Sequence, residues 1–179
     1  MPKTPERSAI VGWGSVTPIG ANPCSTWEAA LSGRSGIQLL QDPWSSDLAT
    51  RIAGRVDETV FASLKPILRR RADRCAQLAL LAARQAWDMA LERAPGLDPD
   101  RVAVVIGTGI GGLSTMHQQH VQLSEGGASR VNPLTVPMLI PDAPAGQVAI
   151  DLGLHGGAHA PVSACASGAE AMMLAQILL

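Results

Sequence analysis

The sequence predicts an α/β fold, in which helices cover a β-sheet. Short apolar runs alternate along the chain with amphipathic segments of helical period, which is the pattern of strands that alternate with helices. The hydrophobic content of 46% predicts a packed core. One Phe, no Tyr and 18 Gly indicate that small residues form the contacts between helices and sheet. The 179 residues are enough for one domain, which we place at residues 1–179.

The N-terminal segment is expected to contain a strand, a loop and a helix. Residues 8–11 form a short apolar run, and a loop follows at 17–20. Asn22 and Pro23 are suited to the N-cap and the first position of a helix, which runs to residue 31 and which Gly33 ends.

A polar connection, a strand and the longest helix are expected next. The stretch 40–46 is polar, and Arg51–Val56 alternates as a strand does. The basic run Arg69–Arg71 is interpreted as a solvated loop rather than a binding patch. Asp73 can cap a helix that runs to about Arg93, because apolar residues recur there at helical spacing: Leu80, Ala83, Trp87 and Leu91.

The middle of the chain combines a buried strand with a glycine-rich turn. Residues 95–96 (Pro-Gly) end the long helix, and Val102–Ile106 is a continuous run typical of a buried central strand. The turn Gly107–Gly112 follows. A helix is expected over Leu113–Glu125, closed by the two glycines at 126–127.

The last part of the chain ends in a strand and a helix. Residues 129–141 are interpreted as extended, and Asp142 as the cap of a short helix that ends at Gly153. An apolar strand then leads into Ala164, and Ala169–Leu179 is rich in helix formers.

Cys165 therefore falls at a corner between a strand and a helix, at or just before the first helical turn. Free backbone N–H groups and the positive end of the helix dipole stabilise a thiolate at such a position. Small neighbours leave room for a substrate, which is typical of a cysteine that accepts an acyl group. The alternative is a buried structural cysteine that acts as a small hydrophobe.

Three other motifs are weaker. The turn at 107–112 satisfies G-x-G-x-x-G, but the acidic residue that should end a second strand about 20 residues later is missing. We therefore interpret it as a tight turn that lets the backbone approach the neighbouring strand, with Ile110 projecting into a cavity. His117 and His120 lack a third metal ligand, and His155 and His159 are interpreted as loop or surface residues. A hydrolase nucleophile elbow would need glycines two residues either side of Cys165, where this chain has serines.

Charge and cysteine content bound the environment. A net charge of −1 argues against nucleic-acid or membrane-surface binding driven by bulk charge. No apolar run is long enough to span a membrane, and Met1–Ser8 lacks the apolar stretch of a signal peptide. Three widely spaced cysteines fit a reducing compartment. We therefore expect a cytoplasmic protein.

Four segments are informative as an ordered set, although each is weak by itself. They are Ile10–Gly20 (IVGWGSVTPIG), Val105–Gly112 (VIGTGIGG), Asn132–Pro141 (NPLTVPMLIP) and Pro161–Gly168 (PVSACASG). They resemble the N-terminal part of the β-ketoacyl-acyl-carrier-protein synthases, the elongating condensing enzymes of the thiolase-like superfamily. The resemblance spans nearly the whole chain. It implies the N-terminal half of a thiolase-like fold, with a layered mixed sheet covered by helices.

The resemblance also implies roles for the matched residues. Cys165 is similar to the nucleophile that takes the acyl group as a thioester, with its own backbone N–H as one oxyanion donor. Ile110 matches the gate of the acyl pocket. Leu134, Thr135 and Met138 belong to the segment that lines this pocket across a homodimer interface, and the strand before Cys165 matches the one that pairs with its twin. Asp142 stands where many relatives have Asn.

The implied partners are acyl carrier protein, which brings the phosphopantetheine arm, and acyl and malonyl thioesters. No metal or redox cofactor is implied. The family's two histidines, its lysine and the second oxyanion donor come from the second half of the enzyme, whereas this sequence ends 14 residues after Cys165, within the nucleophile helix. We expect the chain alone to be inactive in the complete reaction of fatty-acid or polyketide synthesis. The alternative is a non-catalytic remnant that acts only in dimerisation or carrier-protein binding.

Overall fold

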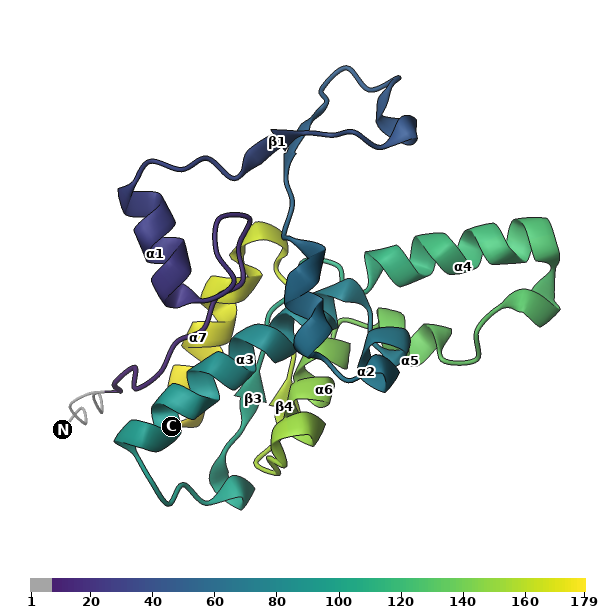
Figure 1. Ribbon diagram of the computed structural model, residues 1–179. Helices are drawn as coiled ribbons and strands as arrows, with labels where there is room; N and C mark the ends of the chain where they lie inside the picture. Colours follow the sequence, from purple (N-terminus) through teal and green to yellow (C-terminus); the bar gives the residue numbers. More distant parts are fainter. Residues whose placement is uncertain (1–7) are drawn as a thin grey trace.

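A pair of parallel strands lies among three helices in the computed structural model, which describes residues 8–179 (Figure 1). Strand β3 (Val104–Val105) pairs with β4 (Ala158–His159), with Val104 opposite Ala158. Helices α6 (Ala143–Leu152) and α7 (Ser167–Leu178) pack against this pair, and α3 (Arg74–Arg93) packs on α6. The predicted α/β class is confirmed. Met1–Arg7, where the sequence predicts no signal peptide, lie outside the described residues.

The hydrophobic core fills the space between α3, α6 and the strands. The predicted apolar face of α3 points into it at Leu80, which is 1% exposed, while Leu91 near the C-terminal end of the helix is 39% exposed. Val104, the buried residue of β3, lies in the same cluster. The other buried members of the core are Phe61, Leu64, Leu81, Ala145, Val148 and Leu154.

Helix α1 (Pro23–Leu31) begins and ends where the sequence predicts. Asn22 accepts a hydrogen bond from the backbone N–H of Ser25 (2.9 Å), and the Ser25 hydroxyl accepts one from the N–H of Asn22 (3.2 Å). These two bonds form a capping box, which satisfies N–H groups that a helix end leaves free. Gly33, with φ +68°, follows the last turn.

Two strands form a separate antiparallel hairpin that extends from the body (Figure 1). The strand expected at residues 51–56 is confirmed as β2 (Ile52–Gly54). Its partner β1 (Ile37–Leu39) was not predicted, because three residues are too short to show an alternating pattern. The polar connection lies in the loop of the hairpin, where Pro43–Ser45 form a 3-10 turn.

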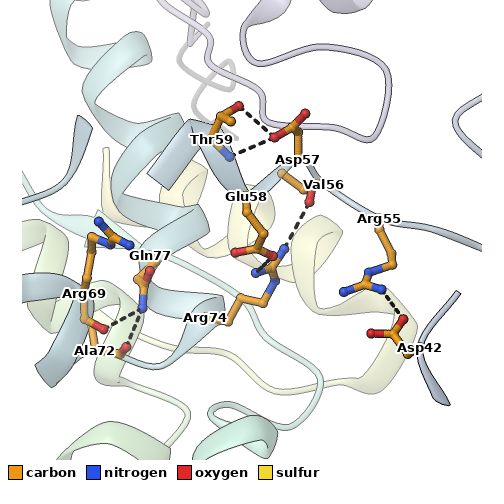
Figure 2. A network of polar contacts seen from close by, with 10 residues as sticks. All are labelled: Asp42, Arg55, Val56, Asp57, Glu58, Thr59, Arg69, Ala72, Arg74 and Gln77. Atoms are coloured by element: carbon orange, nitrogen blue, oxygen red, sulfur yellow. Dashed lines mark hydrogen bonds and ion pairs between the residues drawn. The ribbon is translucent and has the colours of Figure 1, made fainter. Parts of the chain in front are cut away.

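The basic run at residues 69–71 lies in a helix and not in a loop, which corrects the prediction. It forms the last turn of α2 (Pro66–Arg71). The Gln77 side chain donates hydrogen bonds to the carbonyl oxygens of Ala72 (2.8 Å) and Arg69 (3.2 Å), as Figure 2 shows. The carbonyl groups at the end of this short helix thus obtain donors from α3, which the local sequence could not reveal.

The strand expected at residues 8–11 is not formed. The segment runs across α3 instead, so closely that a Cβ atom on Gly12 would lie 2.2 Å from the carbonyl oxygen of Ala86. The Arg93 side chain donates to the carbonyl oxygen of Val11 (3.3 Å) and lies 5.0 Å from the ring centroid of Trp13. A strand needs a hydrogen-bonding neighbour, and within residues 8–179 this segment has none.

The two strands next to the expected site are shorter than predicted. β3 covers two residues of Val102–Ile106, although the bond from Ile106 N to His159 O (3.0 Å) continues the ladder. The expected strand into Ala164 is β4, which ends at His159. Residues 160–163 continue without forming part of a described strand, because β3 turns away at Gly107.

Residues 129–141 are also not extended throughout. They contain a short helix, α5 (Thr135–Leu139), which follows a turn in which Asn132 accepts a hydrogen bond from the N–H of Leu134 (2.9 Å). The long helix before it, α4 (Leu113–Gly126), is confirmed. Helix α6 is also confirmed and ends at Gly153 (φ +65°), but the side chain of Asp142 makes no capping bond.

Asp73 joins two helices through buried hydrogen bonds. Asp73 is only 4% exposed. Its carboxylate accepts a hydrogen bond from the N–H of Cys75 (3.0 Å), which caps α3. It also accepts from both the N–H and the hydroxyl of Thr115 in α4 (2.7 Å each). Burial favours a raised pKa for Asp73, but the hydrogen bonds from Cys75 and Thr115 outweigh it and leave the pKa below its usual value. A second link between helices is the ion pair of Arg84 (α3) with Asp151 (α6), with two contacts of 2.7 Å.

We expect Asp73→Asn to lower the free energy of unfolding by about 1–3 kcal/mol, because an amide NH₂ facing the two donors of Thr115 leaves a buried N–H unpaired. Since the folded-state pKa of Asp73 is lowered, its stabilisation is complete above the pKa of the unfolded chain, about 4, and is lost as the pH falls through the folded-state value. Urea titrations at pH 7 and at lower pH measure this difference.

The matched control is Asp57→Asn. Asp57 accepts the same pair of bonds, from the N–H and hydroxyl of Thr59 (2.8 and 2.7 Å), but it is exposed and its contacts are local (Figure 2). An equal loss of stability in both variants would show that burial between α3 and α4 is unimportant.

Candidate active site

The thiol of Cys165 is exposed and lies directly before a helix. Residues Ala164–Ala166 form a single 3-10 turn, and α7 begins at Ser167. The predicted position of Cys165, at or just before the first turn of a helix, agrees with this structure. A buried structural role, the alternative drawn from the sequence, does not fit an exposed side chain.

The residue before Cys165 has an unusual backbone. Ala164 has φ +49°, and it is the one residue other than glycine with positive φ among residues 8–179. The left-handed region is unfavourable for a side chain with a Cβ atom, so the surrounding structure must hold Ala164 there. This turn aims the chain from the strand side into α7 and places Cys165 at its apex.

The glycine-rich turn after β3 touches the start of α7. A Cβ atom on Gly107 would lie 2.1 Å from the carbonyl oxygen of Ser167, so no other residue fits without displacement. A Cβ on Gly109 would be 3.7 Å from the carbonyl oxygen of Ala164. The close backbone approach predicted for this turn is present, but the segment approached is the start of α7 and not the neighbouring strand, which corrects that part of the prediction.

The same turn also touches α5. Cβ atoms on Gly111 and Gly112 would lie 2.6 Å from the carbonyl oxygen of Leu139 and 2.4 Å from that of Met138. The N–H of Gly112 donates to Leu139 O (2.8 Å). The turn at 107–112, which carries Ile110, therefore contacts the two other segments in which the sequence predicts functional residues: the Cys165 corner and α5.

The residues expected to line an acyl pocket lie on these segments. Ile110 is 62% exposed at the turn. Leu134 stands at the N-cap of α5, and Thr135 and Met138 lie within it; all three are half-buried. Their role in substrate binding stays a prediction.

The other candidate residues lie apart from this corner. His159 belongs to β4, which corrects its interpretation as a loop or surface residue, and His155 is exposed in the loop before β4, with its Nδ1 2.7 Å from Asp100. His117 and His120 are exposed on α4. Within the described part of the chain, no three His, Cys, Asp or Glu residues gather as a metal site would require.

The remaining cysteines differ in environment. Burial, together with the charge of Asp73 beside it, raises the pKa of Cys75 to about 12, so this thiol stays protonated at neutral pH. Cys24 is exposed in the first turn of α1.

Within residues 8–179, no helix is long and apolar enough to span a bilayer.

Polar groups around the corner were missed by the sequence analysis. Ser167 is 3% exposed and its hydroxyl contacts three backbone groups, while the side-chain oxygens of Thr108 and Ser163 are buried without a partner. A serine at the first position of a helix that follows a nucleophile was a possible signal, since serine side chains bond to nearby backbone at helix starts.

Comparisons with known proteins agree on one family. The model of the β-ketoacyl synthase N-terminal domain matches residues 6–179. A 3-oxoacyl-[acyl-carrier-protein] synthase 2 of Staphylococcus aureus (strain N315) is 39% identical over 168 residues, covering 93% of this chain and 41% of the relative. This chain therefore spans less than half the length of that curated relative.

Solved structures show the same fold. A β-ketoacyl synthase from Burkholderia phymatum superimposes with a TM-score of 0.77 at 26% identity, covering 94% of this chain and 42% of the other. A ketosynthase of a type II polyketide synthase, solved with its acyl-carrier protein, superimposes with a TM-score of 0.73 at 21% identity, covering 97% and 47%. The predicted thiolase-like architecture, matching the N-terminal part of these chains, is confirmed.

We expect Gly107→Ala to destabilise the protein by about 1–3 kcal/mol, because the new methyl group would overlap the Ser167 carbonyl. Gly168→Ala is the matched control, since a Cβ there meets nothing within 4 Å and alanine favours a helix by about 0.5–1 kcal/mol. Urea midpoints that fall equally in both variants would contradict the close contact.

Proposed function

Because the chain belongs to the β-ketoacyl synthase family, through its N-terminal domain, we propose that it supplies the acyl-accepting nucleophile of a 3-oxoacyl-[acyl-carrier-protein] synthase. The observation that carries the proposal is the exposed Cys165 at the start of α7, within a segment that the family model matches. The predicted unit 1–179 corresponds to one domain of such an enzyme.

The first step of the proposed reaction is acyl transfer. The Cys165 sulfur attacks the carbonyl carbon of an acyl thioester on carrier protein, and a new carbon–sulfur bond forms. The bond to the carrier's sulfur breaks, and the carrier thiol leaves with the proton that Cys165 gives up. The backbone N–H of Cys165 is the proposed donor to the oxyanion that forms on the way.

The second step is a decarboxylative condensation. Malonyl-carrier protein loses CO₂, and the resulting carbanion attacks the carbonyl carbon of the acyl-Cys165 thioester. The bond to the Cys165 sulfur breaks and β-ketoacyl-carrier protein forms. By resemblance, two histidines outside this sequence support the loss of CO₂. The phosphopantetheine arm is part of the carrier, and this chemistry needs no other cofactor.

Ile110 and α5 are proposed to contact the acyl chain. Ile110 lies in the turn 107–112, and Leu134, Thr135 and Met138 lie on the α5 segment that touches this turn; Gly109 of the same turn approaches the Cys165 corner. The apolar side chains of Ile110, Leu134 and Met138 suit a fatty chain. We further propose that the protein forms a homodimer, in which α5 and the segment before Cys165 face a second copy. The proposed location is the cytoplasm, in soluble form.

The basic turn of α2, for which the sequence predicts a solvated segment rather than a binding patch, is here the proposed contact for carrier protein. Arg69, Arg70 and Arg71 are exposed, and none of them forms an ion pair with a described residue. Hollows of 480 and 290 Å³ lie beside Arg69 and Arg70, the smaller of them also lined by Met138 of α5. The carrier's arm contains an anionic phosphodiester, which guanidinium groups bind well.

A second candidate function is a non-catalytic partner that only dimerises or binds carrier protein. The exposed thiol at the helix start favours the enzymatic role, because a purely structural subunit has no need of it. Acylation of Cys165 distinguishes the two functions.

We expect Cys165 to form a thioester when the protein is incubated with an acyl-carrier-protein thioester, detected as added acyl mass on the peptide that contains residue 165. Cys165→Ala should remove this mass. Cys24→Ala is the matched control: Cys24 is also exposed, but it lies on α1 and not at the proposed site, so this variant should keep the added mass. Equal labelling of the Cys165→Ala protein would reject the nucleophile.

Charge reversal at Arg69 and Arg70 to Glu is expected to weaken carrier-protein binding by about tenfold or more, and raised salt should reduce the difference. Isothermal titration calorimetry with holo carrier protein measures it. Reversal of Arg34 and Arg51, which are also exposed and form no ion pair with a described residue, is the control for net charge. The same loss in both pairs would reject a specific contact.

A further inference from the structure

Ser167 makes side-chain hydrogen bonds on both sides of the strained residue that precedes Cys165. Its hydroxyl accepts from the N–H of Ser163 (3.0 Å) and lies 2.7 Å from the carbonyl oxygen of Ala164. The same oxygen lies 3.1 Å from the carbonyl oxygen of Thr108, in the glycine-rich turn. One buried hydroxyl thus links the segment before the nucleophile, the nucleophile turn and the turn after β3.

These contacts coincide with the left-handed backbone of Ala164. An alanine persists at φ +49° only where surrounding contacts outweigh its preference for other conformations. The Ser167 hydroxyl holds the backbone groups of residues 163 and 164 at a fixed separation. In the described structure, no other side chain forms a hydrogen bond with residues 163–166.

From this geometry we infer that Ser167 is a positioning residue for the nucleophile: its hydroxyl keeps Ala164 in the left-handed conformation and thereby sets the direction from which the Cys165 sulfur meets a thioester. The inference rests on the proposed acyl transfer. It assigns Ser167 no contact with the substrate. Acyl transfer depends steeply on the alignment of sulfur and carbonyl carbon, so a relaxed turn slows the reaction without removing the thiol.

The role can be separated from a general structural one by a compensating substitution. Glycine adopts positive φ without the cost that alanine has, so Ala164→Gly removes the need for Ser167 to enforce the turn. If Ser167 acts through Ala164, the double variant Ser167→Ala/Ala164→Gly recovers what Ser167→Ala loses. If Ser167 serves only packing, the second substitution restores nothing.

The experiment measures the single-turnover rate at which the N-acetylcysteamine thioester of hexanoic acid acylates Cys165, read by mass spectrometry. Ser167→Ala is expected to slow acylation by about tenfold to a hundredfold, and the double variant is expected to return to within about threefold of the unsubstituted protein. Ser63→Ala is the control, because the Ser63 hydroxyl makes a similar bond to a carbonyl three residues earlier (Val60 O, 3.0 Å) but is exposed and remote; its rate should not change.

Two outcomes overturn the inference while the proposed function stands: Ser167→Ala acylates at the unsubstituted rate, or its loss is not recovered in the double variant. If the unsubstituted protein does not acylate at all, the proposed function fails. In that case the hydrogen-exchange rate of the amides of residues 163–166 tests the positioning role by itself. Ser167→Ala must raise this rate about tenfold, while the exchange rate of the α4 amides stays unchanged. Unchanged exchange rejects the role.

Discussion

Direct backbone contact between a turn and a helix start organises the candidate active site. The carbonyl of Ser167, the first residue of α7, occupies the space where a side chain of residue 107 would lie. Glycine at 107 is therefore a steric requirement, independent of backbone conformation, since its φ lies outside the left-handed region. Because the turn also touches α5 through Gly111 and Gly112, one tight segment sets the positions of the Cys165 corner and of the proposed acyl-binding helix.

The body of the domain supports this turn from the other side. A Cβ on Gly112 would lie 3.1 Å from the Cβ of Asp73, so the end of the turn rests on the buried cap of α3. Asp73 in turn holds the start of α4 through Thr115, and the Arg84–Asp151 ion pair links α3 to α6. Helix α3 therefore contacts α4, α6 and the end of the glycine turn, and it fixes their positions relative to one another (Figure 1).

Several features of the site could be predicted from local sequence. The position of Cys165 before a helix follows from small residues that precede a run of helix formers, and the turn 107–112 follows from its glycines. The roles of Leu134, Thr135 and Met138 came from resemblance alone, because nothing in their own pattern indicates a pocket, whereas the glycine turn by itself led us to expect Ile110 to project into a cavity. Ser167 was missed, since a serine shows its hydrogen bonds only when three distant backbone groups meet around it.

By itself, the sequence determined the elements whose causes are local: α1 with its Asn22 cap, α3 with its apolar face, α6 with its terminal Gly153, and the family that the four segments indicate. The tertiary structure decided what depends on neighbours. Residues 8–11 lie on α3 and have no strand neighbour in the described part of the chain, and the helical turn at residues 69–71 ends where Gln77 of α3 donates to the carbonyl oxygens of Arg69 and Ala72. Backbone N–H and C=O groups in strands and at helix ends find their hydrogen-bond partners far along the chain, and no local pattern encodes which partner will be present.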